Sequence, residues 1–557
     1  MYFRIMNESR HRNTVYLSLR TALVLVVFTL ANYTAQAAET THKSCTCRTL
    51  VFAFSGLRWD VEQITRLPSV DRMRSSGVHV KHKINAFQSE SLPSFMTMST
   101  GKYPNEHEII GNNMRNEKGG KFDLSSTSPD WYKNVDPIWL RNQKENGTSA
   151  LCYWPGHDIK GMEPDHTCDE VGLSDPFKEL MENSEISKKV MSFQDRLDKV
   201  KNWLSPTDSV NSSTQTTIPH VKPTFIGAYF EEPYKSMLQY GIQSNETKQA
   251  LKKIDSIIRQ MLDFLKAKEL TNKVNFVVTG ESGVTEIKRH REIFLSDSID
   301  KKIQNKYDII KGAIMPVYPK TKTVEGELFK VWSSSDAVKN KQMRIYRKKD
   351  IPMNFHYKHE TRSAPIVLVA QENWQIYPNR VDNSDKCLMG YDGKYESAHA
   401  LFIAQGPSFK EDEVVPAIGN VDVFAILCRS LGITVGHHSG NNTIVEQLMR
   451  TPEKWYEKVV KKIVKKITAT PSNFVAAIVI GVLLVFGLVF LTITAVYKAC
   501  GCCRQPMRVK VPSPRKLMKK QRKKMMTKKD GAHLLSDKEL SDSDFSDSDD
   551  FYIKEIR

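Results

Sequence analysis

Side chains able to hold a metal ion are scattered along the chain. Protein zinc sites use imidazole, thiolate and carboxylate groups, and no second Cys/His pair joins Cys45 and Cys47 at zinc-finger spacing. We therefore expect disulfide chemistry at Cys45 and Cys47. Other histidines give only weak support for a metal site, and we expect them to be surface or hydrogen-bonded residues: His107, His157, His166, His437 and His438.

Six cysteines precede a long apolar segment near the end of the chain: Cys45, Cys47, Cys152, Cys168, Cys387 and Cys428. An even number of cysteines in an exported chain indicates disulfides. Cys152 and Cys168 form the best pair because they close a short loop. The spacing leaves the pairing of the other four open.

Short apolar runs separated by tens of residues predict strands buried on both faces of a sheet. These runs occupy residues 50–54, 149–154, 223–230, 273–280, 365–370 and 400–406. Residues 246–268 repeat apolar side chains at helical spacing just before one of these strands. The pattern predicts an α/β fold with an open sheet covered by helices, whose sites lie at the carboxyl ends of the strands.

Several motifs follow one another in the order of a known enzyme family: "FSGLRWD", "GKYPNEHEIIGNNM", "WPG", "AYFEEP", "GYDGKYESAHALFIAQGPSF" and "NVDVFAILCRSLGI". They resemble the nucleotide pyrophosphatase/phosphodiesterase (ectonucleotidase) family of the alkaline phosphatase superfamily. The resemblance runs from about Leu50 to Gly432. It implies an alkaline phosphatase-like core sheet and, in active members, two zinc ions beside a threonine nucleophile.

The resemblance also shows where this chain departs from that chemistry. A zinc pair activates the nucleophile and neutralises charge on the reacting phosphate. Ser91 stands at the nucleophile position, where a hydroxyl without a base or metal is weak. Of the six ligand positions only one keeps a carboxylate, so we expect no zinc cofactor: Ser55, Tyr234, Leu238, Glu281, Ser282 and Met389.

Two further positions of the family's ligand site are retained. The asparagine that would hydrogen-bond a phosphate survives as Asn112, and Trp154 stands beside the family's nucleobase pocket. These residues keep open a small-ligand role for a chain that has lost the cations.

The ends of the chain predict export and membrane anchoring. Residues 1–37 have the basic region, apolar run and small-residue site of a signal peptide. Residues 474–497 carry no charge and are long enough to cross a bilayer. We expect a type I plasma-membrane protein: extracellular domain 38–451, juxtamembrane stalk 452–473, single transmembrane helix 474–497 and disordered cytoplasmic tail 498–557.

Modification and lipid contact are predicted on both sides of this span. Sequons for glycosylation occur at Asn146, Asn211, Asn245 and Asn441. Cys500, Cys502 and Cys503 are candidates for palmitoylation. Phosphorylation by acidophilic kinases is predicted among aspartates at Ser541, Ser543, Ser546 and Ser548.

The net charge of +18 owes much to twelve basic residues between Arg504 and Lys529. A basic cluster next to a span attracts anionic lipid, and phosphorylation of the acidic tail would weaken that attraction. A solvated tail without this switch is the alternative. No nucleic-acid-reading element is recognisable, so we expect no nucleic-acid partner.

The preferred interpretation is a cell-surface glycoprotein whose phosphodiesterase-like ectodomain is a pseudoenzyme. It would bind a surface protein or an active family member, more readily than a nucleotide. The alternative is an ectonucleotide pyrophosphatase/phosphodiesterase with an altered site, which hydrolyses nucleotide or phospholipid phosphodiesters through Ser91 and Glu281. A third interpretation makes the outer body a spacer for the tail.

Overall fold

The computed structural model describes residues 47–168, 190–205, 222–380 and 385–450, together with positions 175, 177, 209–210, 217–218 and 486. These ranges fall in the compact unit Met1–Pro452, apart from position 486. The predicted signal peptide, stalk, transmembrane segment (except Phe486) and tail lie outside them. Within the described ranges, no helix combines the length and apolar character needed to span a bilayer.

A central sheet of eight strands forms the core of the fold, in the order β20-β2-β19-β10-β1-β9-β5-β6. Its middle strand, β1, pairs in parallel with β10 and β9, whereas β19 runs antiparallel to β10 and β2. The strand bounds, in sheet order, are Glu413–Gly419, Val78–Ile84, Ala400–Gln405, Val274–Gly280, Arg48–Phe54, Phe225–Phe230, Ser149–Cys152 and His166–Thr167.

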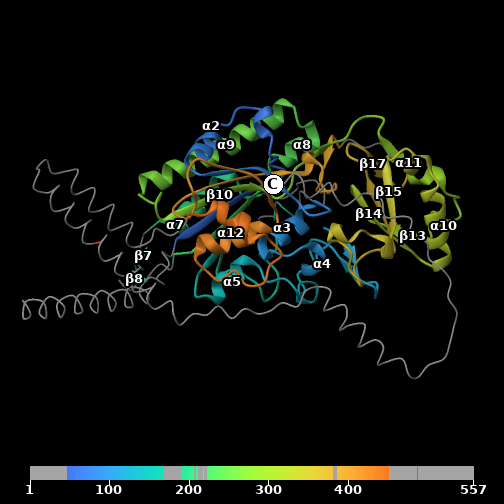
Figure 1. The fold of residues 1–557 in the computed structure, drawn as a ribbon, viewed down its shortest axis with the longest axis horizontal. Coiled ribbons are helices and arrows are strands. Elements are labelled where there is room, and N and C mark those ends of the chain that lie inside the picture. Colours follow the sequence, from blue (N-terminus) through green and yellow to red (C-terminus); the bar gives the residue numbers. More distant parts are fainter. Residues whose placement is uncertain are drawn as a thin grey trace, which may run out of the picture. The chain divides into compact units, whose positions relative to one another are not determined.

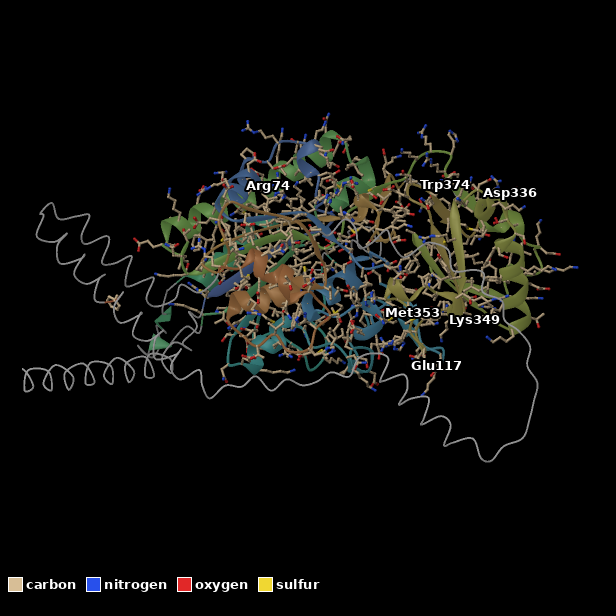
Figure 2. All side chains as sticks on the ribbon, viewed as in Figure 1. Arg74, Glu117, Asp336, Lys349, Met353 and Trp374 are labelled. Carbon is tan, nitrogen blue, oxygen red and sulfur yellow. A yellow bond between two sulfur atoms is a disulfide. The ribbon has the colours of Figure 1, made fainter. Side chains whose placement is uncertain are left out.

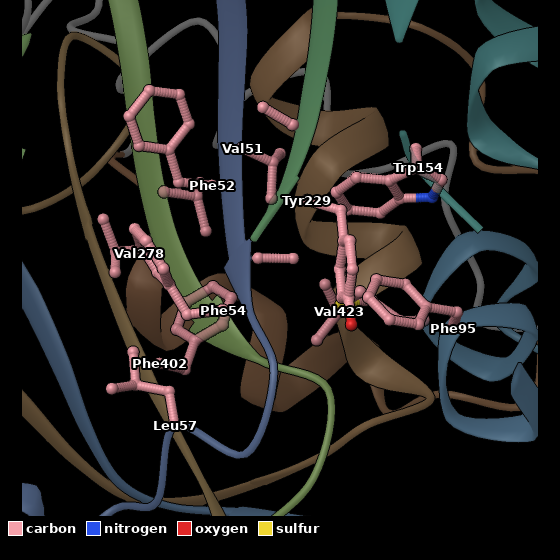
Figure 3. Packing of buried hydrophobic residues seen from close by; sticks show 14 of the residues in the cluster. Val51, Phe52, Phe54, Leu57, Phe95, Trp154, Tyr229, Val278, Phe402 and Val423 are labelled. Atoms are coloured by element: carbon pink, nitrogen blue, oxygen red, sulfur yellow. The ribbon is translucent and has the colours of Figure 1, made fainter. Parts of the chain in front are cut away.

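The central strands are apolar throughout because both faces of the sheet are covered. All residues of β9 and β10 are buried. Aromatic rings meet on β1 and its neighbours, where Phe54 stacks on Phe230 at 4.7 Å and Phe52 lies edge-on to Phe276 at 5.1 Å. Figure 3 shows Phe52 and Phe54 in this core. Five of the six predicted strand runs lie in this sheet.

Helices cover the sheet in two groups (Figure 1). One group packs around α9 (Asn245–Ala267) and contains α2 (Pro68–Ser76), α7 (Phe193–Leu204) and α8 (Tyr234–Tyr240). The other packs around α12 (Asp422–Leu431) and contains α3 (Ser91–Thr100), α5 (Ile138–Lys144) and α13 (Asn442–Leu448). The predicted helix at 246–268 is confirmed as α9, which Ser244 caps by accepting a hydrogen bond from the Thr247 N–H.

A second, smaller sheet has its own core. Four antiparallel strands follow the order β13-β14-β16-β15, with bounds Tyr307–Ile309, Ile314–Pro319, Ile366–Ala370 and Met343–Arg347. The helices α10 (Lys322–Ser333) and α11 (Asp336–Lys339) accompany them. The run at 365–370, expected beside the other buried strands, is therefore a strand of this sheet. A short uniform apolar run does not specify which sheet it joins.

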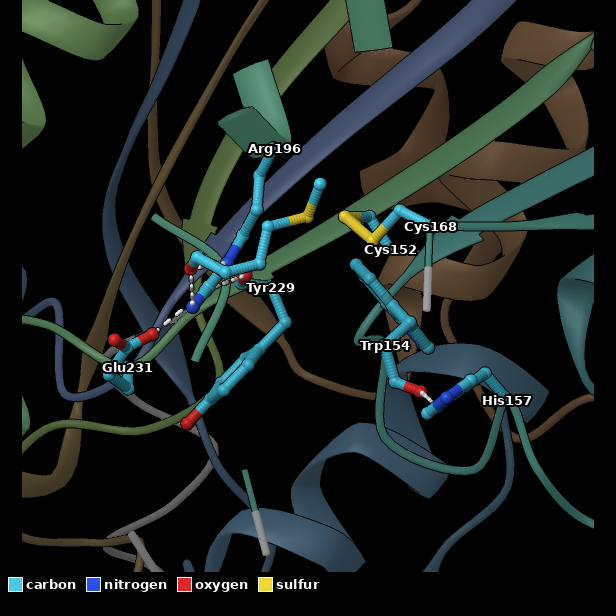
Figure 4. The surroundings of a disulfide bond; sticks show 8 residues. Cys152, Trp154, His157, Cys168, Arg196, Tyr229 and Glu231 are labelled. Atoms are coloured by element: carbon cyan, nitrogen blue, oxygen red, sulfur yellow. Dashed lines mark hydrogen bonds and ion pairs between the residues drawn. A yellow bond between two sulfur atoms is a disulfide. The ribbon is translucent and has the colours of Figure 1, made fainter. Parts of the chain in front are cut away.

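The predicted Cys152–Cys168 disulfide is confirmed, with the two Cα atoms 4.8 Å apart (Figure 4). Near it, the fully buried guanidinium of Arg196 is paired with Glu231 at 2.8 Å and donates to the carbonyl of Tyr229. By contrast, Cys387 and Cys428 are buried free thiols, so the expected disulfide pairing does not extend to them.

Candidate functional site

The ends of the three central parallel strands bring the substituted ligand positions to one edge of the sheet. Ser55 directly follows β1, Glu281 and Ser282 follow β10, and Tyr234 begins the helix after β9. Carboxyl ends of parallel strands meet at the same edge of a sheet. The Tyr234 N–H also donates to the Ser55 carbonyl at 2.9 Å. This edge is where the resemblance places the reaction.

The carboxylate of Glu281 is the centre of this site. Its Oε1 accepts hydrogen bonds from the hydroxyls of Ser55 at 2.7 Å and Ser91 at 3.1 Å. Its Oε2 accepts from the Gly56 N–H at 3.2 Å. The Ser91 Oγ also lies 3.4 Å from the Met389 sulfur. We call Ser55, Ser91, Glu281 and Met389 the Glu281 cluster.

The cluster is closed to solvent. Ser55 and Glu281 are 0% exposed, Ser91 is 1% exposed and Met389 is 6% exposed. Burial raises the pKa of the Glu281 carboxyl, and the hydrogen bond from Ser55 opposes this effect. The site is therefore a packed polar core and not an open cleft.

A buried cation that the sequence did not reveal lies near this carboxylate. The Lys83 ammonium donates to Asn420 Oδ1 at 2.8 Å and to the Glu281 carbonyl at 3.3 Å. Burial lowers the pKa of Lys83 to about 7, while the Glu281 charge works in the opposite direction. The alternation of β2, "VHVKHKI", gives no signal for an inward lysine. A register shift opposite Ala400 and Phe402 changes which residues of the strand face inward.

In the described part of the chain, the side-chain hydrogen bonds to the Glu281 carboxylate come from Ser55 and Ser91, and the remaining ligand positions add none. Ser282 is buried and donates to the carbonyl of Gly283 at 3.0 Å. Leu238 is half-buried and packs against the core. Tyr234 is buried, and burial raises the pKa of its phenol well above the usual range.

These residues do not fit the zinc pair that the family implies. Zinc requires several imidazole, thiolate or carboxylate donors, whereas this site offers hydroxyls, a phenol, a thioether, a leucine and one carboxylate. Each of the two serines beside the carboxylate already donates its hydroxyl to Glu281. Over the described part of the chain, no three His, Cys, Asp or Glu side chains gather as a metal-binding group.

Asn112 has a structural role at the start of α3. Its Oδ1 accepts a hydrogen bond from the Leu92 N–H at 2.9 Å, and its own N–H donates to Glu90 at 2.7 Å. Burial raises the pKa of Glu90 to about 7, and the Asn112 N–H opposes this shift. Asn112 thus fixes the helix that carries Ser91.

Trp154 is a core residue and presents no surface to a ligand. It is 0% exposed, its ring lies edge-on to Phe95 at 5.2 Å, and its indole N–H points to the Ser99 hydroxyl at 3.4 Å (Figures 3 and 4). A Cβ atom at Gly227 would lie 2.8 Å from the indole. Trp154 is therefore a packed side chain in this structure, and its place beside the family's nucleobase pocket stays a prediction.

The histidines considered as metal ligands are held by hydrogen bonds or lie at the surface. His107 is buried between the Thr97 hydroxyl and the Ile109 N–H, each 3.1 Å from a ring nitrogen, and burial lowers its pKa to about 3. His157 Nδ1 lies 2.8 Å from the Trp154 carbonyl oxygen (Figure 4). The partly or fully exposed histidines are His166, His437 and His438.

Comparison with known proteins agrees with this geometry. Residues 49–395 match the profile described as type I phosphodiesterase / nucleotide pyrophosphatase. The chain is 27% identical over 411 residues to ectonucleotide pyrophosphatase/phosphodiesterase family member 5 of Homo sapiens, covering 72% of this chain and 78% of that protein. It is 31% identical over 413 residues to the bis(5′-adenosyl)-triphosphatase ENPP4 of Pongo abelii, covering 73% and 82%.

Comparison with solved structures supports the same family. An inactive variant of murine ectonucleotide pyrophosphatase/phosphodiesterase 5 in complex with AMP superimposes with a TM-score of 0.63 at 26% identity, covering 72% of this chain and 100% of that chain. The α/β core is therefore of the alkaline phosphatase type. The chain belongs to the type I phosphodiesterase / nucleotide pyrophosphatase family.

Proposed function

We propose that the phosphodiesterase-like domain of this chain does not hydrolyse phosphodiesters and acts by binding. The Glu281 cluster is the observation that supports this proposal. Its one carboxylate is surrounded by hydrogen-bond donors of the protein itself, at 2.7, 3.1 and 3.2 Å. A phosphodiester brings negative charge to the nucleophile, and a buried carboxylate would repel it where the family uses cations.

One observation favours an altered-site hydrolase as the second candidate. The Ser91 hydroxyl lies 3.1 Å from the Glu281 carboxylate, which is within reach for a general base. Ser91 and Glu281 are both closed to solvent, so a substrate would reach them only after Met389 and its surroundings moved. We therefore rank this activity second.

The two candidates are separated by measuring zinc content and turnover on one sample. The purified protein is assayed for bound zinc and for hydrolysis of a nitrophenyl nucleotide ester, with and without added zinc. A bis(5′-adenosyl)-triphosphatase relative serves as the positive control. Turnover no greater than that of a Ser91→Ala variant supports the binding role. Two zinc ions per chain, with turnover that Ser91→Ala abolishes, would replace it with the hydrolase.

We further propose that this domain is the ectodomain of a type I plasma-membrane glycoprotein. The Cys152–Cys168 disulfide supports an oxidising compartment. Exposed side chains at Asn146, Asn245 and Asn441 are accessible for glycosylation. The partner would be a cell-surface protein or an active family member, with the tail held near anionic lipid. Surface labelling of intact cells, with mass loss on glycosidase treatment, tests the topology; an unglycosylated protein inaccessible from outside would refute it.

A further inference from the structure

A long groove lies beside the smaller sheet, away from the Glu281 cluster. Two cavities, of about 940 and about 570 Å³, share Asn116, Glu117 and Thr361 in their walls and so lie side by side. Figure 2 shows Glu117 and Lys349 in this part of the molecule. We call the residues lining the two cavities the basic groove. It has no residue in common with the Glu281 cluster.

The groove carries a large excess of positive charge. Eleven basic and four acidic side chains line it. Three of the acids are already neutralised, Asp308 by Arg115 at 2.7 Å, Glu325 by Lys322 at 2.8 Å and Asp130 by Lys133 at 3.0 Å. Among the described residues, seven of the groove's cations have no carboxylate at ion-pair distance: Lys118, Lys121, Lys320, Arg347, Lys348, Lys349 and Lys358.

Several of these cations are positioned by groups that leave their charge uncompensated. The Lys358 ammonium donates to the Lys349 carbonyl at 2.8 Å, and the Lys320 ammonium donates to the carbonyl of Asn305 at 2.8 Å. The Arg347 guanidinium lies over the Phe329 ring at 4.0 Å. Carbonyl oxygens and a ring orient a cation without cancelling it, so the groove is organised to receive anions.

Separate segments of the chain contribute to one positive field. The pKa of Asp308 is lowered chiefly by its hydrogen bond from Arg115, and the charges of Lys320 and Lys121 lower it further. Arg115 and Lys121 belong to the hairpin strands β3 (Met114–Arg115) and β4 (Lys121–Phe122), whereas Lys320 directly follows β14. The cations of the hairpin and the smaller sheet therefore face the same space.

The aromatic residues of the groove discriminate between classes of polyanion. Single-stranded nucleic acid is bound by stacking bases on open aromatic rings. In this groove Arg115 covers Tyr318 at 5.1 Å, and Arg362 covers Trp131 at 5.0 Å. The stacking surface of both rings is thus reduced, which leaves charge as the main recognition element.

From these observations we infer that the basic groove binds a sulfated linear polysaccharide. Its many sulfates and carboxylates match the seven uncompensated cations of the groove, and it needs no stacking platform. The Cys152–Cys168 disulfide indicates an oxidising compartment, where such polysaccharides are the abundant polyanions. The inference goes beyond the proposed function and does not depend on whether the Glu281 cluster is inactive.

The test uses full-length protein in detergent and a heparin oligosaccharide as the probe. Because the basic segment Arg504–Lys529 would also attract heparin, the measurement must distinguish binding at the groove from binding at that segment. Hydrogen exchange is therefore followed at amides of residues 114–122 and 343–358 while heparin is titrated at physiological salt. We expect protection in both segments.

Two double variants locate the effect. Lys348→Ala with Lys349→Ala removes the charges of a half-buried and an exposed lysine. It should shift the midpoint of protection about tenfold, the effect of losing two surface charge pairs. Lys301→Ala with Lys302→Ala removes the same charge from exposed lysines outside the groove and should leave the midpoint unchanged. Lys348→Arg with Lys349→Arg keeps both charges and should leave the midpoint unchanged.

Three outcomes would overturn the inference. One is protection confined to residues beyond 503, and another is an equal shift in both double variants. The third is displacement of heparin by a single-stranded oligonucleotide of equal charge at equal concentration, which would reassign the groove to nucleic acid.

Discussion

Replacing Glu281 tests whether its carboxylate is a structural centre. In Glu281→Ala the Gly56 N–H loses its acceptor, and a buried unpaired donor costs about 1–3 kcal/mol. The hydroxyls of Ser55 and Ser91 lose theirs as well, but they can rotate, so we assign them about 1 kcal/mol together. We therefore expect the free energy of unfolding to fall by about 2–4 kcal/mol. Glu281→Gln keeps one acceptor oxygen and should lose about 1 kcal/mol.

The assay is urea unfolding of the purified protein, followed by tryptophan fluorescence. Glu286→Ala removes an exposed carboxylate five residues away and should change stability by less than about 0.5 kcal/mol. A Glu281→Ala protein as stable as this control would refute the assignment of Glu281 as a hydrogen-bond centre.

The raised pKa of Glu281 also predicts how the stability difference between wild type and Glu281→Gln changes with pH. Burial raises the pKa of Glu281, so the folded state holds its proton more tightly than the unfolded state. The stability from this group is greatest at acid pH and is lost as pH rises through the folded-state pKa. The stability of Glu281→Gln relative to wild type should therefore increase from about pH 4 upward. A relative stability independent of pH would show that Glu281 titrates normally.

Three further predictions concern buried groups. The pKa of Lys83 is lowered to about 7, so burying its charge destabilises the folded state most below that pH. The stability of Lys83→Met relative to wild type should therefore increase by about 2–4 kcal/mol as the pH falls from alkaline to neutral. A difference in urea unfolding that does not change with pH would contradict this. Trp154→Ala should lose about 3–5 kcal/mol of stability in urea unfolding, and a loss below about 1 kcal/mol would show that the indole adds little to the core. Removing the disulfide by Cys152→Ser with Cys168→Ser should cost about 3 kcal/mol for its short loop, and a loss below about 1 kcal/mol in thermal unfolding would show that the loop is held by packing alone.

Local patterns predicted much of the fold because the buried positions of a strand or helix are occupied by apolar residues at characteristic spacings in the sequence. The runs at 50–54, 223–230 and 273–280 became the parallel centre of the sheet, and the helix at 246–268 appeared within one residue of its predicted bounds. The family motifs also located the Glu281 cluster, because residues that directly follow parallel strands meet at one edge.

Lys83 shows where local pattern fails. The two-residue alternation of a strand predicts one set of inward positions, but the register shift in β2 inserts an extra residue and reverses the alternation beyond it. A long-range pairing with β19 causes that shift. The sequence of β2 alone therefore contains no signal that an ammonium group is buried near Glu281.

The sequence by itself determined the family, the order of the buried strands along the chain and the helix before β10, and it predicted the loss of the metal ligands, since each of these depends on residue types at short spacing. Only the tertiary structure decided that Trp154 is a core residue, that Glu281 is surrounded by hydroxyls and that Arg115, Lys320 and Lys349 share one groove. Those facts depend on how segments hundreds of residues apart pack together, and the energy of a buried or clustered charge is set by its neighbours in space.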